Sequence, residues 1–307
     1  MARFDRSTAR WMLFPPSMTT ATTESAAPAS AELAPGTHAA TTAHARSTRW
    51  RGALARGLHR YLPTVLIFAG VLLAWQLVVT VFGVREYILP SPAAVWRALV
   101  DGDQRWGMHM LITTAEVLGG FVAAGIVGVL LGTAIAWSDT ASRALMPFLV
   151  FVNTLPKVAI APLILLWFGY GIGPNMLIGA IIGFFSVVIN TAAGLSQIDQ
   201  DMIDLGRVFH APKWRVFVKI RIPNAYPYIL SALKITATSA VVGAILGEFV
   251  ASQKGLGYVI ITTQSSMNTP VAFAAVALVS VIGLALFGVV AGLGRLLAPW
   301  AVDTAEH

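Results

Sequence analysis

Long apolar runs are the feature of this sequence that most constrains its fold. About six stretches contain few charged side chains and approach the roughly 20 residues that a helix needs to cross a hydrocarbon core. They cover residues 63–83, 117–137, 145–168, 174–195, 226–250 and 271–293. Only 11% of the residues are charged, whereas about a quarter are charged in soluble domains. The sequence therefore predicts an all-α membrane protein with about six transmembrane helices.

The distribution of Lys and Arg predicts which side of the membrane each loop faces, because basic residues beside the spans are retained in the cytoplasm. With the N-terminus inside, the arginines up to Arg60, the basic residues of segment 199–223 and Arg295 all lie inside. The outer loops then hold few basic residues. Both termini are expected to be cytoplasmic.

The N-terminal segment 1–57 differs from the rest, because Ala, Thr, Ser and Pro dominate it and large apolar side chains are scarce. It is expected to be a disordered cytoplasmic tail, and its basic residues near the first span form either a short amphipathic helix or a solvated stretch. Translation could begin at Met18, and deletion of residues 1–45 is expected to leave transport intact. The remaining expected segments are the first helix with its outer loop (58–105), a five-helix membrane domain (106–297) and a cytoplasmic C-terminal tail (298–307).

Several kinds of chemistry lack support in the sequence. The chain has no cysteine, which excludes disulfides and thiolate sites, and its histidines lack the spacing of metal ligands. No GxxxxGK[ST] phosphate loop is present, so ATP and other cofactors are not expected to bind to this chain. The basic residues flank apolar runs, which argues against a nucleic-acid partner. No catalytic grouping is visible, so the chain is not expected to be an enzyme.

The polar segment 199–223, DQDMIDLGRVFHAPKWRVFVKIRIP, is the most informative part of the chain. Its large apolar residues recur at mostly helical intervals with charges between them, which predicts two short amphipathic helices that meet near Ala211 and Pro212. Such a hairpin could lie on the membrane surface. It could also dock a cytoplasmic partner, since Trp, Phe and Arg are typical of protein–protein hot spots.

This segment resembles the cytoplasmic loop motif of binding-protein-dependent ABC importer permeases, Glu-Ala-Ala, three residues, Gly, nine residues, then Ile-x-Leu-Pro. Asp, His and Ile replace the Glu, the Gly and the Leu of the motif. The motif positions are taken by Asp204, Leu205, Gly206, His210, Ile220, Ile222 and Pro223. The resemblance implies an ATPase-coupling loop that also includes Ala211, Pro212, Lys213, Trp214 and Phe217.

Segments 89–99, 153–171, 190–195, 223–235 and 243–260 resemble the nitrate, sulfonate and taurine branch of these permeases, which also includes permeases for thiamine-pyrimidine precursors and riboflavin. The resemblance covers residues 89–297. It implies a type I ABC importer permease fold in the bacterial inner membrane, and a homodimer or pseudo-dimer of permeases. It also implies two cytoplasmic ATPase subunits that bind ATP and an extracytoplasmic solute-binding protein.

Polar groups inside the spans are candidates for the translocation path, because they are costly in lipid. They are Asn153, Lys157, Asn190, Thr191 and Glu248. Lys157 would suit a small anionic solute such as a sulfonate, taurine or nitrate, but it could equally pair with a carboxylate. Glu248 could be merely interfacial, and Lys234 is expected to snorkel to the inner headgroups. A pyrimidine precursor or riboflavin is the alternative solute. A secondary transporter and an intramembrane enzyme are the alternatives of other classes.

Overall fold

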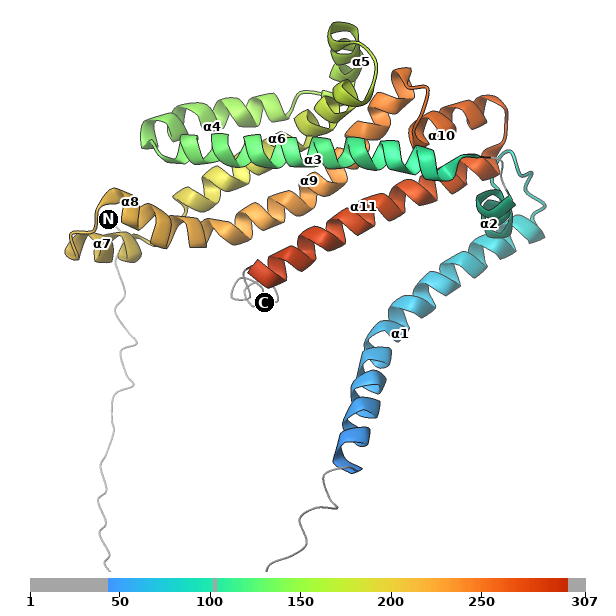
Figure 1. The fold of residues 1–307 in the computed structure, drawn as a ribbon, viewed down its shortest axis with the longest axis horizontal. Helices are drawn as coiled ribbons and strands as arrows, with labels where there is room; N and C mark the ends of the chain where they lie inside the picture. The colour runs from blue at the N-terminus through green and yellow to red at the C-terminus, as the bar shows by residue number, and fades with distance from the viewer. Residues whose placement is uncertain (1–43, 102–103, 298–307) are drawn as a thin grey trace, which may run out of the picture. The chain divides into compact units, whose positions relative to one another are not determined.

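The computed structural model describes residues 44–101 and 104–297, and every regular element in those ranges is a helix. The chain divides into two units, residues 1–63 and 64–307, and the packing described below lies in the second. In chain order, and shown in Figure 1, the elements are α1 (His44–Val81), α2 (Pro92–Asp101), α3 (Trp106–Ala136), α4 (Asp139–Asn153), α5 (Lys157–Phe168), α6 (Ile172–Ser196), α7 (Gln200–Val208), α8 (Lys213–Val216), the π-helical turn η1 (Phe217–Arg221), α9 (Ile222–Ala251), α10 (Leu256–Ser265) and α11 (Thr269–Leu297).

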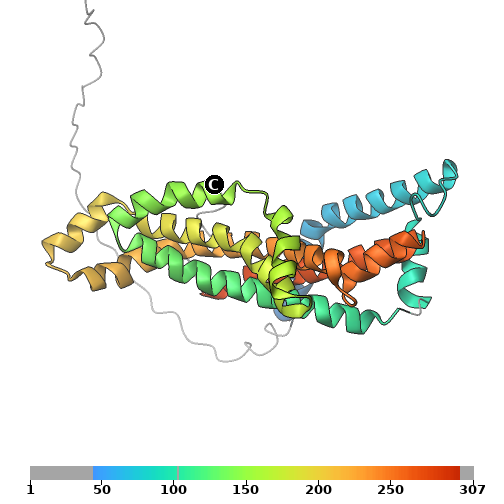
Figure 2. The ribbon, with the colours of Figure 1, turned by 90° about the horizontal axis from the view of Figure 1, so that it is seen from above.

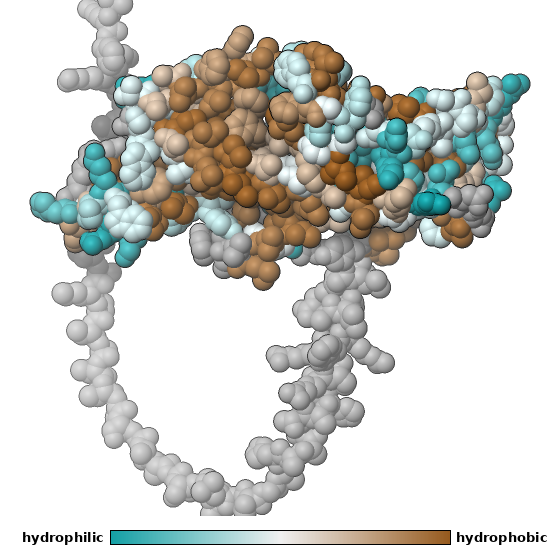
Figure 3. Space-filling view, turned by 45° about the horizontal axis from the view of Figure 1, so that its top comes forward, coloured by the Kyte–Doolittle hydropathy of each residue, from teal (hydrophilic) through white to brown (hydrophobic). Residues whose placement is uncertain are grey.

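The helices confirm the expectation of an all-α membrane protein. Five segments are long and apolar enough to cross a membrane: Leu62–Val81, Trp106–Ala136, Ile172–Ser196, Lys213–Val250 and Thr269–Leu296. A sixth span results if the bent pair formed by α4 and α5 is counted as one. Figure 3 shows apolar residues across the middle of one face and hydrophilic residues toward both ends, as expected for a belt in contact with lipid.

The third expected span, residues 145–168, is not one continuous helix. The structure breaks it into α4 and α5, whose axes are bent by 88°. Pro156 stands directly before α5, where it lacks an N–H to donate and disfavours a helical conformation at Leu155. Both effects end α4 and allow the chain to change direction.

The long helices alternate in direction, as successive membrane crossings require. In Figures 1 and 2, α3 and α6 run from the end that carries α10 toward the end that carries α7 and α8, while α4 and α9 run back. The α7–α8 segment therefore lies at one end of α6 and α9, and the α9–α10 turn lies at the other.

Glycines on α3 allow its close approach to α6. An added Cβ at Gly128 would lie 2.6 Å from Cβ of Val187, and one at Gly132 would lie 2.7 Å from Cβ of Thr191. Both distances are shorter than real Cβ contacts. The two helices can pack at this distance only because these positions lack side chains.

Two segments differ from the sequence-based boundaries. Residues 44–57, which the sequence analysis assigned to the disordered tail, belong to α1, while residues 1–43 and 298–307 lie outside the described part of the chain. The second span begins at Trp106, eleven residues before the expected position 117. This extension brings Glu116 into the interior of a membrane helix.

Candidate functional site

The α7–α8 segment joins α6 to α9 and has the helix–break–helix form that the sequence predicted. Residues 209–212 separate α7 from α8, and Pro212 is the N-cap of α8. The chain then makes the π-helical turn η1 and continues into α9, which has Pro223 in its first turn. Because η1 connects directly to a membrane helix, a displacement of α8 is passed to α9 without an intervening loop.

His210 adopts a backbone φ of +47°, in the left-handed region that glycine adopts most readily. His210 is also the residue at the glycine position of the loop motif. The geometry therefore gives a physical reason for a glycine at this position, and it shows that His210 is accommodated there at some conformational cost.

Three side chains, in η1 and the first turn of α9, anchor the C-terminal end of this segment. The Phe217 ring packs edge-on against Trp137, with ring centroids 4.9 Å apart. Arg221 Nη1 donates to the Ala136 carbonyl at the end of α3, at 3.4 Å. Asn224 Nδ2 donates to the carbonyls of Gly194 and Gln197 at the end of α6, at 3.0 and 2.8 Å. The segment is thereby fixed to the ends of two membrane helices.

The outer face of the same segment is apolar and open. Trp214 is 65% exposed and Phe209 is 74% exposed, and Leu205 and Val208 are also exposed. We call these four residues the α7–α8 apolar surface. Beside it lies a groove of about 440 Å³, lined in part by Lys213. Large apolar side chains exposed together on a short polar segment are typical of a protein-binding site.

The remaining residues of the expected coupling loop divide between the two faces. Phe217, which was expected in the coupling loop together with Trp214, packs inward on Trp137. Those on the exposed side are Asp204, His210, Pro212, Lys213, Ile222 and Pro223. Those that are buried or half-buried are Gly206, Ala211, Phe217 and Ile220.

Lys157 begins α5, directly after the break at Pro156. Its Nζ donates to Asn153 Oδ1 at 2.6 Å and lies 5.1 Å from the centroid of the Phe185 ring. Neither partner carries a charge, and the ammonium has no other hydrogen bond or ion pair in the described part of the chain. The expected alternative, an ion pair with a carboxylate, is absent there.

The other candidate path residues are distributed differently. Asn190 is half-buried, and its Nδ2 donates to the Ser186 carbonyl of its own helix at 2.8 Å. Thr191 and Glu248 are fully buried, so neither lines an open path in this conformation. The expected alternative, a Glu248 side chain at the membrane interface, is also wrong, because protein encloses this side chain. Of the five candidates, the structure brings together only Asn153 and Lys157.

A buried polar cluster near the α9–α10 turn was missed by the sequence analysis. Glu116 and Asn175 are each 1% exposed, and Asn175 Nδ2 donates to Glu116 Oε1 at 2.9 Å and to Ser252 Oγ at 3.0 Å. Thr113 Oγ1 donates to Glu248 Oε1 at 2.6 Å. The expected span began one residue after Glu116, since a charge normally marks the end of an apolar run.

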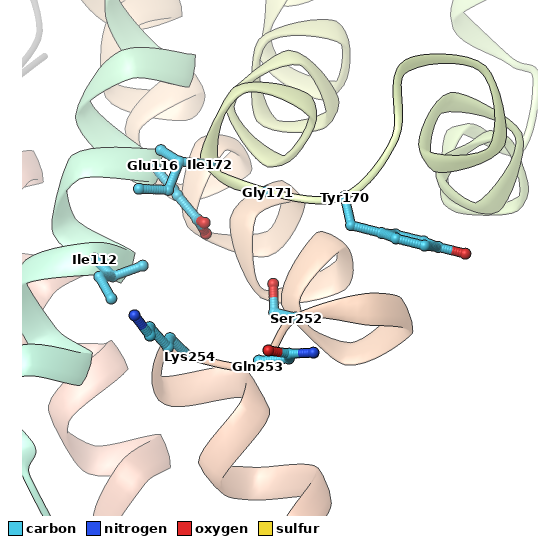
Figure 4. A pocket seen from close by; sticks show the side chains of 8 residues that line it. All are labelled: Ile112, Glu116, Tyr170, Gly171, Ile172, Ser252, Gln253 and Lys254. Atoms are coloured by element: carbon cyan, nitrogen blue, oxygen red, sulfur yellow. The ribbon is translucent and has the colours of Figure 1, made fainter.

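Glu116 and Ser252 of this cluster line a pocket of about 430 Å³ (Figure 4). In the close-up the Glu116 carboxyl points into the space between the α5–α6 and α9–α10 links, and Lys254 extends toward Ile112. The lining residues are Ile112, Glu116, Tyr170, Gly171, Ile172, Ser252, Gln253 and Lys254. The described residues contain no group of three or more His, Asp or Glu side chains that could hold a metal ion.

The fold and the α7–α8 segment are those of a membrane subunit of a transporter, and comparisons with known proteins identify the family. The chain belongs to the binding-protein-dependent transport system inner membrane components, whose family description matches residues 124–301. It is therefore an integral inner membrane protein of the ABC permease class, as the loop motif indicated.

Relatives extend the match over most of the chain. The riboflavin transport system permease protein RibX of Chloroflexus aurantiacus is 36% identical over 243 residues, 78% of this chain and 89% of the relative. The taurine transport system permease protein TauC of Escherichia coli is 26% identical over 84% of this chain and 95% of its own length. A chain from an inward-facing MetNI methionine ABC transporter matches at a TM-score of 0.53 and 16% identity, over 61% of this chain and 94% of that chain. At that identity the likeness concerns the fold alone.

Proposed function

We propose that this chain forms the translocation path of an ATP-driven importer, as a homodimer or pseudo-dimer. Two cytoplasmic ATPase subunits drive the cycle, and an extracytoplasmic binding protein delivers the solute. The α7–α8 segment and both termini of the chain lie on the cytoplasmic side. The basic residues of segment 199–223 and Arg295 support this orientation.

The observation that carries this proposal is the pairing of an exposed apolar surface with a rigid base. Trp214 and Phe209 are open to a partner, while Phe217 and Arg221 tie the same segment to α3. A partner bound at Trp214 can therefore transmit force to the membrane helices. A flexible loop would dissipate such a force.

Co-purification of the ATPase tests the proposal. Trp214→Ala is expected to weaken ATPase association at least about tenfold while membrane insertion stays normal, because truncation of a central aromatic anchor commonly costs about 2 kcal/mol. Lys213→Ala serves as the matched control, since a charge at the rim contributes less than an anchor. Full association of Trp214→Ala together with loss in Lys213→Ala would show that electrostatics dominates docking and that the anchor assignment is wrong.

The solute proposed is a small anion of the sulfonate, taurine or nitrate type. Lys157 supports this, because its half-buried ammonium has only neutral partners and an anion would compensate its charge. The similarity to TauC is in keeping with this choice. A heterocyclic solute is the second candidate, since RibX, the relative named for riboflavin, is 36% identical.

Transport by Lys157→Leu distinguishes the two solutes. The variant is expected to insert normally and to lose transport of taurine or methanesulfonate at least about tenfold, because a buried charge-assisted contact is removed. Thr154→Ala, an exposed neighbour in the same break, is the control. Unchanged transport of every anion tested, with riboflavin uptake detected, would favour the second candidate.

A further inference from the structure

Two buried carboxyl groups from different membrane helices meet near the α9–α10 turn. Glu116 on α3 and Glu248 on α9 are each 1% exposed, and their carboxyl groups lie close enough to influence each other electrostatically. Two ionised carboxylates in contact would repel each other and would both lose their hydration. The pair therefore requires a compensating positive charge or a proton.

The hydrogen bonds around Glu248 identify it as the ionised partner. The Thr113 hydroxyl accepts from the backbone N–H of Leu256 at 2.8 Å and donates to Glu248 Oε1 at 2.6 Å. The backbone N–H of Gly257 donates to Glu248 Oε2. Each oxygen thus accepts a hydrogen bond, and the Gly257 N–H can only donate, which suits a carboxylate.

Glu116 has the opposite surroundings. Its Oε1 accepts from Asn175 Nδ2 at 2.9 Å, but its Oε2 is buried and no donor reaches it in the described part of the chain. A buried carboxylate oxygen without a donor is costly, whereas a protonated oxygen beside a carboxylate becomes a donor with a strong acceptor.

We propose that Glu116 and Glu248 form a proton-binding site, in which Glu116 holds the proton and donates it in a hydrogen bond to the Glu248 carboxylate. The other titratable or charged groups around the pair are His109 on α3, Tyr170 and Lys254 in the two links, and Tyr258 on α10. None of their side chains donates a hydrogen bond to either carboxyl group in the described residues. His109 Nδ1 accepts from the Gly255 N–H at 3.0 Å and so faces the turn.

The α9–α10 turn is built around this pair. Gly255 has a φ of +106°, and an added Cβ at Gly255 or Gly257 would overlap the Glu248 carboxyl group. Ser252 and Lys254, in the same turn, line the pocket shown in Figure 4. The shared proton consequently joins the turn to α3. Asn175, which donates to Glu116 and Ser252, joins both to α6. Loss of the proton places two negative charges in contact and loosens the wall of this pocket.

Thermal unfolding of the full-length chain in detergent, measured across pH, tests the site with isosteric variants. Glu116→Gln is expected to melt within about 2 °C of the wild type at neutral pH, because its carboxamide can accept from Asn175 and donate to Glu248. Glu248→Gln is expected to melt at least about 5 °C lower, because its amide NH₂ would face the Thr113 and Gly257 donors. Glu86→Gln, at an exposed position, is the control and should melt at the same temperature as the wild type.

The pH dependence supplies a readout that a merely structural role would not change. At neutral pH the folded chain holds one more proton than the unfolded chain, whose glutamates are ionised, so the stability of the wild type falls as pH rises. Glu116→Gln removes this component, and His109, Tyr170, Lys254 and Tyr258 remain in both proteins as a common background.

Three results would overturn the proposal. The first is a Glu116→Gln protein that fails to fold or melts as low as Glu248→Gln. The second is an identical pH slope in the wild type and Glu116→Gln. The third is a melting temperature of the wild type that rises with added Na⁺ or Ca²⁺ at constant ionic strength, a rise that Glu116→Gln abolishes. That result would show that a metal cation, and not a proton, compensates the pair.

Discussion

The Phe217 ring lies edge-on against the Trp137 indole, with ring centroids 4.9 Å apart at an interplanar angle of 62°. This contact joins the π-helical turn at the start of α9 to the residue that follows α3. Trp214, only three residues earlier, is 65% exposed. Two aromatic residues of one short segment thus have different surroundings, since Trp214 is open to a partner and Phe217 packs on a membrane helix. Substitutions at the two positions should have different effects.

Phe217→Ala is expected to uncouple ATP hydrolysis from transport without releasing the ATPase. Removal of the ring costs about 1–3 kcal/mol of local stability, because the contact with Trp137 and its apolar burial are both lost. The measurement is solute-stimulated ATP hydrolysis alongside ATPase co-purification, with Phe217→Leu as the conservative control. Loss of the ATPase from Phe217→Ala, to the extent expected for Trp214→Ala, would argue against separate roles.

His210→Gly is expected to stabilise the α7–α8 segment, since glycine adopts a φ of +47° with little cost. His210→Val should destabilise it by about 1–2 kcal/mol, because a β-branched residue is strained in the left-handed region. Thermal unfolding of the two variants in detergent measures the difference. If valine is tolerated as well as glycine, the backbone at this position does not have the left-handed geometry.

Gly128→Ala is expected to destabilise the chain by about 1–3 kcal/mol, because the new Cβ would lie 2.6 Å from Cβ of Val187. Gly125→Ala is the matched control on the same helix, where the nearest atom is 3.4 Å away. Adding Val187→Ala to Gly128→Ala should recover part of the loss by making room for the methyl group. Equal melting temperatures for the two alanine variants would contradict the close contact of α3 with α6.

The sequence predicted the elements whose signals are local. Apolar runs of sufficient length located the membrane helices, and the apolar spacing with a central proline gave the two short helices around Pro212. The loop motif also located the glycine-like conformation at His210, although its physical basis became clear only from the backbone angle.

Features that depend on distant residues were not predictable in the same way. Proline in an apolar run is compatible with either a kink or a complete break, so the 88° bend before Pro156 could not be deduced. The sequence placed the end of a span at Glu116, because a charged residue normally lies outside the membrane. The residues that make its burial possible come from α6 and α9, more than 50 residues away. The inward packing of Phe217 likewise depends on Trp137, which lies in another part of the sequence.

Single-cysteine labelling tests the central claim, that the α7–α8 apolar surface binds the ATPase, most directly. The chain has no cysteine, so Val208→Cys and Lys254→Cys each report one exposed position, at opposite ends of the bundle, and both keep the Trp214 anchor. Maleimide labelling of both variants is measured with the permease alone and with the ATPase bound. The account predicts that bound ATPase slows labelling at position 208 by at least about tenfold, because a position inside the interface is shielded from water, and leaves position 254 unchanged. Equal labelling of position 208 with and without the ATPase would contradict it.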